Sequence, residues 1–372
     1  MITTNRVLSC LQPTGEMHIG NYFGAVANWV KLQSERDCIY GVVDLHAMTM
    51  PFEPKVLRAN TLNMVLDLLA AGIDPENATL FIQSLVPEHV ELAWIFGCIC
   101  PIGDLYRMTQ FKEKSDLVEE RGGAFISAGL FTYPVLQAAD ILVYRADRVP
   151  VGKDQEQHLE LSREIARRFN YLFGEYLPEP APLFTESPKV MSLADPEKKM
   201  SKSLGDRHYI GLFEDEESVR KKVKTAVTDS NMAKLAVAIV NAAANAAAAD
   251  AVGKKEEAAM WAAEAALAAT SEASPGVANM LELLSACGKD ETAASLRKEY
   301  DAGTLRYVNL KGEVAEALVE LTSGMRRRRK ELQKNPEYVR NVIRNGSSDA
   351  RDIARATLKE VRALTGLPGR EW

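Results

Sequence analysis

The sequence predicts an α/β fold, in which a parallel sheet is followed by a helical C-terminal part. Strand-like and helix-like stretches alternate over residues 6–83, which is typical of a parallel sheet whose strands are connected by helices. Residues after about Leu212 have helical patterns. The length of 372 residues is sufficient for two domains. We therefore expect a first domain over 1–212 and a second over 213–372.

Three strands are expected in the first part of the chain, at residues 6–12 (RVLSCLQ), 38–43 (CIYGVV) and 79–83 (TLFIQ). Helical spacing of apolar residues follows at 21–34 and at 55–71, where Gly72 is typical of a helix end. Ligands of parallel sheets bind at the carboxyl ends of the strands. We expect the functional residues at that end.

Residues 88–121 are predicted to be mostly helical, and further helices are predicted at 130–142 and 156–169. Residues 178–188 are expected to form a proline-rich connection. Residues 313–366 are strongly helical and contain the basic run RRRRK at 326–330. Successive helix residues are about 100° apart, so this run surrounds its helix. A solvated surface and a contact with RNA phosphates both remain open.

Composition excludes several classes of protein. A net charge of −6 argues against a generally basic nucleic-acid coat protein, but it allows a local basic face. Five cysteines at irregular spacing indicate buried, free thiols in a reducing compartment. The N-terminal residues lack a signal core and no apolar run reaches membrane length. We expect a cytoplasmic protein without a membrane segment.

Segment 231–272 differs in composition from the rest of the chain. Roughly half of residues 231–270 are alanine, which predicts a helical hairpin with its turn at 253–255. Alanine buries little surface, so the hairpin needs a partner such as another copy of itself. An engineered or grafted helix pair and a lineage-specific insertion both remain open as its origin.

Two distant motifs suit a nucleoside triphosphate. Residues 12–21 read QPTGEMHIGN, and residues 199–203 read KMSKS. His18 and Asn21 lie at a strand-to-helix turn, where free backbone N–H groups favour an anion. Two lysines on a loop can neutralise charge on a leaving pyrophosphate. The alternatives are an ordinary tight turn and a solvated loop.

A third set of polar residues lies on the predicted helix 130–142. Tyr133, Gln137 and Asp140 are spaced by four and then three residues, so they share one helix face. We favour a pocket over a structural polar cluster, because an apolar helix would not bury a carboxylate without a use for it. His46 follows the second strand and suits either the pocket or the core. The five histidines show no metal-ligand spacing, so no metal site is expected.

Together these motifs resemble the class I aminoacyl-tRNA synthetases. Residues 108–115 (MTQFKEKS) and 149–155 (VPVGKDQ) resemble the tryptophan-specific branch. The resemblance covers about residues 1–230 and 274–365. It implies a Rossmann-like, HUP-type nucleotide-binding sheet in a catalytic domain over 1–212. The helical domain over 213–372 would then lie on the anticodon side of the tRNA.

The resemblance also implies roles for individual residues. It implies contacts with ATP for Gln12, Pro13, Thr14, Gly20, Asn21, Gly152, Lys153, Asp154, Val190, Met191, Lys199, Met200, Ser201, Lys202 and Ser203. The phosphates and the transition state would be served by His18, Asn21, Lys199 and Lys202. For tryptophan it implies Asp140 as acceptor of the indole N–H, Tyr133 and Gln155 as partners of the ammonium, and Gln137, Leu8, Val149, Val151 and His46 as further pocket residues. Many relatives carry an acid at the position of Lys153.

The reaction implied is ATP-dependent activation of L-tryptophan to its adenylate, followed by transfer to tRNA(Trp). Mg²⁺ would arrive with ATP, and the enzyme would be a homodimer. A tyrosine–tRNA ligase is the alternative, because the spacing of Tyr133, Gln137 and Asp140 also resembles the tyrosine branch. Many tryptophan enzymes carry Met at the position of Gln137. A third hypothesis is a synthetase body that carries 231–272 as a module for assembly or self-association.

Overall fold

The computed structural model describes residues 5–108, 126–150, 152, 155–184, 188–228, 244–245, 247, 251, 254, 259–260 and 273–369. The chain forms two compact units. Unit 1 comprises Met1–Met17, Ala25–Ser187 and Met325–Trp372, and unit 2 comprises His18–Gly24 and Pro188–Gly324. These bounds differ from the predicted boundary after residue 212. The assignment of a catalytic domain and a tRNA-side domain stays a prediction.

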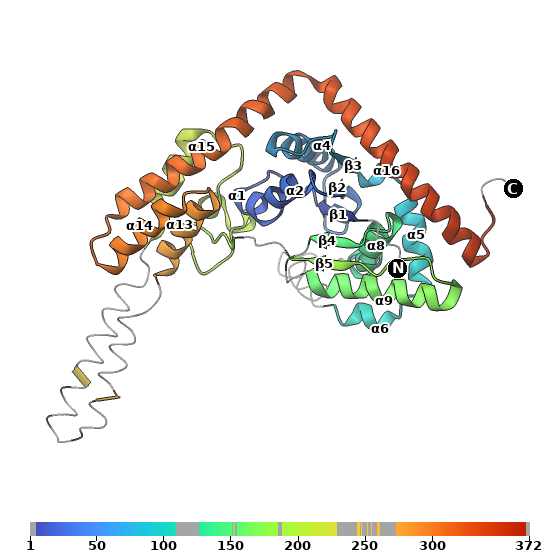
Figure 1. Ribbon diagram of the computed structural model, residues 1–372, viewed down its shortest axis with the longest axis horizontal. Coiled ribbons are helices and arrows are strands. Elements are labelled where there is room, and N and C mark those ends of the chain that lie inside the picture. Colours follow the sequence, from blue (N-terminus) through green and yellow to red (C-terminus); the bar gives the residue numbers. More distant parts are fainter. Residues whose placement is uncertain are drawn as a thin grey trace. The chain divides into compact units, whose positions relative to one another are not determined.

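Unit 1 is built on a parallel sheet of five strands in the order β3-β2-β1-β4-β5 (Figure 1). The strands are β1 (Arg6–Leu11), β2 (Asp37–Val42), β3 (Ala78–Ile82), β4 (Arg148–Pro150) and β5 (Ala181–Leu183). In the central strand, Val7 pairs with Cys38 of β2 on one side and with Arg148 of β4 on the other. The predicted parallel α/β fold is confirmed, and the three predicted strands form one half of the sheet.

Strands β4 and β5 were missed by the sequence prediction, which gave 178–188 as an irregular connection. Both strands have only three residues, so they are too short for an alternating pattern. The backbone N–H of Ala181 donates to Asp147 over 3.0 Å and starts the pairing. Pro182 is tolerated because β5 pairs on one side alone, and an edge strand needs fewer donors.

Helices cover the sheet of unit 1. They are α2 (Ala27–Leu32), α3 (Asp44–Ala47), α4 (Pro54–Ala71), α5 (Glu88–Gly97), α6 (Ile102–Tyr106), α8 (Ala128–Val143), α9 (Glu156–Phe173) and α16 (Pro336–Thr365), with a 3-10 turn η2 at Gln83–Leu85. Helix α4 confirms the prediction for 55–71, and Gly72 ends it with a φ of 119°. The prediction that residues 88–121 are mostly helical is confirmed for the described part of that range, which forms two helices because α5 ends at Gly97 and Pro101 precedes α6. Residues 109–125 lie outside the described part of the chain.

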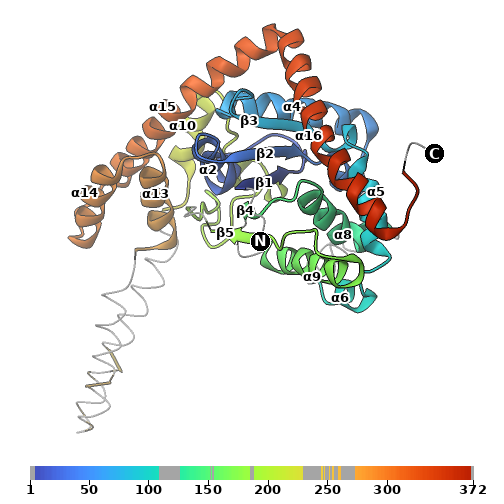
Figure 2. The ribbon, with the colours of Figure 1, turned by 45° about the vertical axis from the view of Figure 1, so that its right-hand side comes forward.

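Helix α16 lies beside β3 in both views of the ribbon (Figures 1 and 2). The contact requires a glycine, because a Cβ at Gly346 would lie 2.1 Å from the carbonyl oxygen of Leu80. One residue later, the hydroxyl of Ser347 accepts a hydrogen bond from the backbone N–H of Ile82 at 3.3 Å. The helix therefore covers the edge of the sheet and satisfies one of its donors.

Buried acids of unit 1 pair with arginines of the C-terminal helices. Glu88 is fully buried and lies 3.1 Å from the guanidinium of Arg351 on α16. Asp67 of α4 accepts from Arg329 at 2.6 Å. Arg329 belongs to the basic run at 326–330, so this arginine has a structural partner that neither sequence hypothesis included. Arg327 and Arg328 are exposed.

Unit 2 contains the helices α1 (Ile19–Asn21), α10 (Glu216–Thr225), α13 (Pro275–Ala286) and α14 (Asp290–Asp301), and the 3-10 turns η4 (Lys202–Leu204) and η5 (Asp206–His208). Helix α15 (Tyr307–Lys334) runs from unit 2 into unit 1. The helix predicted at 21–34 is divided, because a π-helical turn, η1 (Tyr22–Val26), separates α1 from α2. The predicted hairpin at 231–272 lies outside the described residues, apart from a few single positions.

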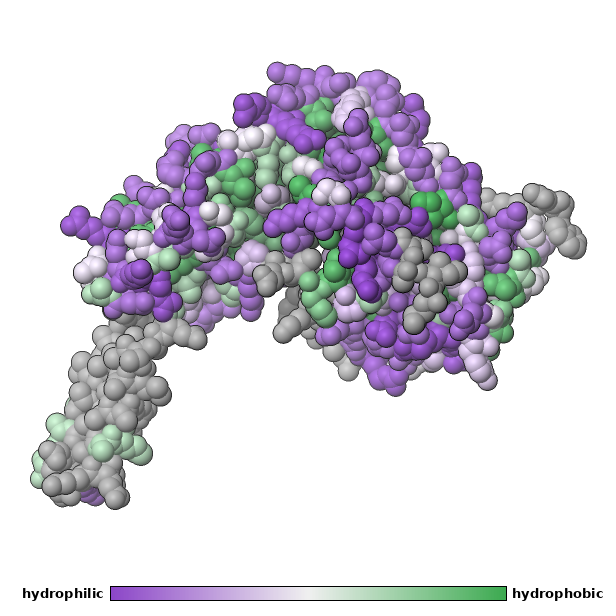
Figure 3. All heavy atoms as spheres, viewed as in Figure 1, coloured by the Kyte–Doolittle hydropathy of each residue, from purple (hydrophilic) through white to green (hydrophobic). Residues whose placement is uncertain are grey.

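The surface in the view of Figure 3 is dominated by hydrophilic residues. In the described part of the chain, none of the helices combines the length and the apolar character that a membrane span needs. All five cysteines are free thiols. The prediction that they are buried is confirmed for Cys38 alone, since Cys10, Cys100 and Cys287 are half-buried and Cys98 is exposed at the end of α5.

Candidate active site

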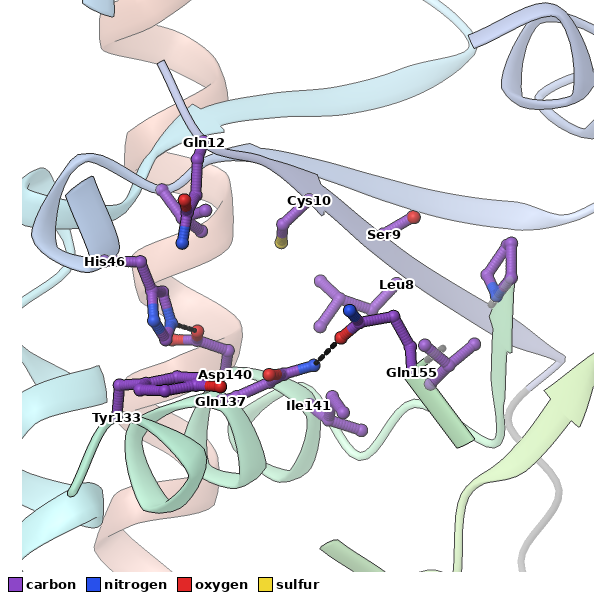
Figure 4. Close-up of a pocket in the computed structure, with 13 residues that line it drawn as sticks. Leu8, Ser9, Cys10, Gln12, His46, Tyr133, Gln137, Asp140, Ile141 and Gln155 are labelled. Atoms are coloured by element: carbon purple, nitrogen blue, oxygen red, sulfur yellow. Dashed lines mark hydrogen bonds and ion pairs between the residues drawn. The ribbon is translucent and has the colours of Figure 1, made fainter. Parts of the chain in front are cut away.

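A cavity of about 340 Å³ opens in unit 1 between β1, α3 and α8. Its volume lies within the range of about 300–1,000 Å³ that is usual for small-molecule sites. The lining residues are Leu8, Ser9, Cys10, Gln12, Val43, His46, Tyr133, Gln137, Asp140, Ile141, Val149, Pro150 and Gln155. In Figure 4, Tyr133, Gln137 and Asp140 rise from one face of α8 toward Cys10 and Gln12. The helical spacing of the three polar residues thus places them together in one wall.

Asp140 is the centre of a buried polar network. Its Oδ2 lies 2.6 Å from Nε2 of His46, and its Oδ1 lies 2.6 Å from Nδ1 of His89. The side-chain amide of Gln83 donates to Oδ1 at 2.7 Å. Asp140 itself is 3 % exposed. Three donors from three elements therefore surround a carboxylate that opens to the cavity on one side.

This environment keeps the carboxylate ionised. Burial alone would raise the pKa of Asp140, but the charges and hydrogen bonds of His46 and His89 lower this pKa to about 2. An ionised carboxylate only accepts hydrogen bonds. The wall of the cavity therefore presents an acceptor to an N–H or O–H of a bound molecule.

The other polar residues of the cavity are held less tightly. The hydroxyl of Tyr133 pairs with Nε2 of His158, which is buried beneath it, at 2.8 Å. The amide of Gln137 donates to Gln155 at 3.4 Å, as the dashed line in Figure 4 shows. These groups lie on the same face of α8 and at the start of α9. They can orient the polar end of a ligand whose apolar part lies deeper.

In unit 2, the turn at 18–21 is a closed capping motif. The backbone N–H of Asn21 donates to Nδ1 of His18 at 3.3 Å, and the backbone N–H of His18 donates to Oδ1 of Asn21 at 3.2 Å. The backbone N–H of Ile19 donates to Ile210 at 2.9 Å, which ties the turn to the segment after residue 203. A Cβ at Gly20 would lie 3.5 Å from Cβ of Met200, so the two motifs are in close contact.

The segment 199–203 is held through its backbone. Met200 donates to Val190 at 3.1 Å, and Met191 and Lys199 form an antiparallel bridge. Asn279 of α13 bonds both backbone groups of Met191, at 2.9 and 3.0 Å. Only Met200 points inward and is buried, while Lys199 is exposed. The arrangement fixes the backbone of the segment, in which Lys199 is exposed and Lys202 is half-buried.

Both lysines act on His18. Burial, which has the largest effect, and the positive charges of Lys202 and Lys199 together lower the pKa of this imidazole to about 4. The histidine is therefore neutral at pH 7, and the positive charge beside it belongs to the lysines. Such a cluster of ammonium groups at a helix N-terminus is suited to a phosphate anion.

The chain is similar to known proteins over nearly its whole length. A family described as tRNA synthetases class I (W and Y) matches residues 3–323. The chain is 41 % identical over 364 residues to tryptophan–tRNA ligase 2 of Streptomyces avermitilis. This match spans 97 % of this chain and 96 % of that protein. It is 39 % identical to the tryptophan–tRNA ligase of Clostridium acetobutylicum, over 97 % of this chain and 96 % of that one. A crystal structure of the tryptophanyl-tRNA synthetase of Campylobacter jejuni, complexed with ADP and tryptophan, superposes with a TM-score of 0.74 at 30 % identity, covering 97 % of this chain and all of that one.

The chain belongs to the class I tRNA synthetases of the tryptophan and tyrosine group. The sequence prediction of an aminoacyl-tRNA synthetase with this fold is therefore confirmed at the level of the family. Within this synthetase, the roles predicted for single residues stay predictions.

The cavity brings together most of the predicted amino-acid pocket of the synthetase. Its lining includes Leu8, His46, Tyr133, Gln137, Asp140, Val149 and Gln155. Val151, Lys153 and Asp154 lie outside the described residues. Gln12, predicted for ATP, lines this same cavity, whereas Gly20, Asn21, Val190, Met191 and residues 199–203 belong to unit 2. Pro13 and Thr14 belong to unit 1, as does Gly152.

Four residues of the synthetase that shape these sites were missed from the sequence. Gln83 directly follows β3, so the rule that ligands lie at strand ends could have found it. Tyr144 is the C-cap residue of α8 and lies four residues after Asp140. His89 and Asn279 gave no signal, because their partners are 51 and 88 residues away in the chain.

Proposed function

We propose that the chain is a tryptophan–tRNA ligase that activates L-tryptophan with ATP and transfers it to tRNA(Trp). The observation that carries the proposal is the cavity of unit 1, whose wall presents the ionised carboxylate of Asp140. The names of the two relatives at about 40 % identity support tryptophan, as does the tryptophan bound in the structure of the Campylobacter jejuni enzyme.

In this proposal, unit 1 recognises the amino acid. The indole N–H donates to Asp140, and its ring lies against Leu8, Ile141 and Val149. The ammonium group contacts Tyr133 and Gln155, which lie on the same lining. The carboxylate of tryptophan attacks the α-phosphate of ATP in line, so that an oxygen–phosphorus bond forms while the bond to pyrophosphate breaks. No nucleophile of the enzyme takes part.

Unit 2 serves the phosphates. Lys199 and Lys202 neutralise the charge that grows on the leaving pyrophosphate, and Ser201 donates a hydrogen bond. Neutral His18 donates an N–H from Nε2, because its Nδ1 already accepts from the backbone. Among the described residues, no cluster of histidine, cysteine and acid side chains could hold a metal ion. We place Mg²⁺ on ATP itself. We also place the enzyme in the cytoplasm, where its tRNA is found.

The test is exchange of labelled pyrophosphate into ATP, measured with tryptophan and with tyrosine in separate reactions. Exchange that depends on tryptophan and exceeds exchange with tyrosine by at least a hundredfold supports the proposal. Exchange with tyrosine alone would assign the chain to the other branch of the family. Charging of tRNA(Trp) then tests the second step.

We also propose that the enzyme is a homodimer, on the basis of an apolar surface on α5 and α6. Trp94 is 77 % exposed, and Val90, Ile102 and Tyr106 are more than half exposed on the same two helices. Monomeric proteins rarely leave such a group of large apolar side chains in water. A second copy of the chain is the partner that the family resemblance implies.

Light scattering of the wild type and of Trp94→Glu tests the dimer. The wild type should have twice the mass of the chain, and the variant should dissociate at micromolar concentration. Tyr171→Glu is a suitable control, because Tyr171 is 87 % exposed and lies on α9. A wild type with the mass of one chain would refute the proposal.

A further inference from the structure

The donors around Asp140 do not all face the substrate, and this difference determines what the cavity can bind. Only Asp140 and His46 belong to the lining of the cavity. Gln83 and His89 are fully buried behind the carboxylate and direct their N–H groups at Oδ1. Oδ1 is thereby saturated from inside the protein. Oδ2 accepts from His46 and retains room for one further donor.

His89 is fixed in one orientation by its second neighbour. Because an ionised carboxylate cannot donate, Nδ1 of His89 carries the proton that Asp140 accepts. Nε2 on the other side of the ring lies 2.7 Å from the hydroxyl of Tyr144, so both ring nitrogens are engaged. The ring of Phe81 stacks on His89 with an interplanar angle of 16°. Tyr144, His89 and Asp140 thus form a chain of hydrogen bonds that ends at the cavity.

The consequence concerns the choice between an indole and a phenol. An indole N–H only donates, so one bond to Oδ2 satisfies it completely. A phenol hydroxyl donates and also needs a donor for its own oxygen. On this wall, the proton on Nε2 of His46 is already engaged with Asp140. Gln137 on the same wall donates to Gln155, so a bound phenol oxygen would have to compete with these bonds for its donor or use the second N–H of Gln137, whereas an indole needs no such donor.

We infer that Tyr144, His89 and Gln83 are positioning residues for substrate selection. They hold Asp140 so that one acceptor position, on Oδ2, is left for the substrate, and this favours tryptophan over tyrosine. This inference rests on the proposed function. None of the three residues touches the substrate. They act through the orientation of Asp140, because the loss of one donor lets the carboxylate turn and frees a donor for a phenol oxygen.

The experiment compares His89→Leu with His89→Asn. Leucine removes the N–H that Asp140 accepts, whereas asparagine offers an amide N–H near the position of Nδ1. We expect the ratio of kcat/KM for tryptophan to that for tyrosine to fall at least tenfold in His89→Leu. It should stay within threefold of the wild type in His89→Asn. The loss should lie in KM for tryptophan, with kcat within about threefold of the wild type.

Tyr144→Phe gives a second measurement if His89→Leu folds poorly, and Tyr40→Phe is its matched control. Tyr40 is also fully buried and donates its hydroxyl to a backbone carbonyl, that of Trp29, at 2.9 Å. Both variants lose one buried hydrogen bond, but only Tyr144→Phe should lower the selectivity, by about threefold to tenfold. Equal changes in the two variants would indicate a structural role only and would overturn the inference.

Equilibrium binding of tryptophan and tyrosine, measured by calorimetry, separates the inference from the proposed function. A wild type without turnover but with tighter binding of tryptophan would contradict the proposed reaction and still allow the selectivity to be measured. An active, tryptophan-specific wild type whose selectivity survives His89→Leu and Tyr144→Phe would refute the inference alone. A wild type that prefers tyrosine would refute both.

Discussion

The cavity wall of unit 1 and the 199–203 segment of unit 2 use opposite methods to present charge. Asp140 is a buried anion whose position is determined by side chains from α3, η2 and α5. Lys199 and Lys202 are cations on a segment whose backbone is held by Val190 and by the bridge to Met191. A small, rigid amino acid is best recognised by fixed partners. A phosphate chain whose charge moves during the reaction is better served by lysines that can follow it.

The histidines sharpen this difference. His46 and His89 surround a carboxylate, and they favour its ionised form. His18 lies beside two lysines and stays neutral, with its pKa lowered to about 4. Histidine therefore stabilises a negative charge in unit 1, whereas in unit 2 it stays neutral and adds no positive charge to that of the lysines. The immediate neighbours, more than the residue itself, decide its role.

The largest effect is expected from Asp140→Asn. An amide cannot accept from three donors and also from the substrate, so kcat/KM for tryptophan should fall at least a hundredfold in pyrophosphate exchange. The free energy of unfolding should fall by about 2–4 kcal/mol, because buried N–H groups lose their acceptor. Asp37→Asn is the control, because Asp37 forms an exposed pair with Arg6. Activity close to the wild type would exclude Asp140 from recognition.

Lys202→Ala should impair the step assigned to unit 2 and leave the binding of tryptophan in unit 1 unchanged. We expect kcat for exchange to fall about a hundredfold, because charge on the leaving pyrophosphate is less well neutralised. The Kd for tryptophan should not change, since the cavity belongs to unit 1. Lys198→Ala is a matched control three residues after Asp195, with which Lys198 forms an exposed pair. A large rise in the Kd for tryptophan would contradict the separation.

Arg329→Ala tests the buried carboxylate of Asp67, which, unlike that of Asp140, does not line the cavity. We expect a loss of stability without a loss of activity. Asp67 would lose the hydrogen bond that it accepts from Arg329 at 2.6 Å, so the free energy of unfolding should fall by about 2–3 kcal/mol. Activity at 25 °C should remain within twofold. Arg327→Ala, at an exposed position of the same helix, should change stability by less than about 0.5 kcal/mol. Urea unfolding measures both, and equal stabilities would refute the structural role of Arg329.

The smallest effect concerns pH and His18. Its pKa is about 4 in the folded protein and about 6.5 when unfolded, so the unfolded chain binds the proton first as the pH falls. The contribution of His18 is complete above pH 6.5 and is lost between pH 6.5 and 4, amounting to about 1–3 kcal/mol. The difference in unfolding free energy between the wild type and His18→Asn should therefore shrink over this interval. A constant difference would refute the shift.

Much of the fold could be predicted because it is determined locally. The strands at 6–12, 38–43 and 79–83 and the helix at 55–71 carry apolar patterns that belong to their own residues. β4 and β5 could not be predicted, because three-residue strands exist only through pairing with β1 and with each other. The division of helix 21–34 by a π-turn likewise has no pattern in the sequence.

The candidate site divides in the same way. Tyr133, Gln137 and Asp140 share a helix face, so their spacing predicts their proximity. Leu8, His46 and Val149 were placed beside them by the family resemblance, and the cavity includes all three. The partners that orient Asp140 come from elsewhere in the chain, since His89 and Gln83 are 51 and 57 residues away. Such pairings arise only when the sheet has formed.

The contact between Gly346 and β3 has a consequence for how the protein is made. Ser347, which satisfies a donor of β3, lies 265 residues after Ile82 in the chain. A ribosome adds about 5–20 residues per second, so the edge of the sheet stays uncovered for roughly 13–50 seconds. During that time, a nascent chain presents an open strand to its neighbours. Protection of this strand by chaperones therefore matters most in the interval between the synthesis of β3 and that of α16.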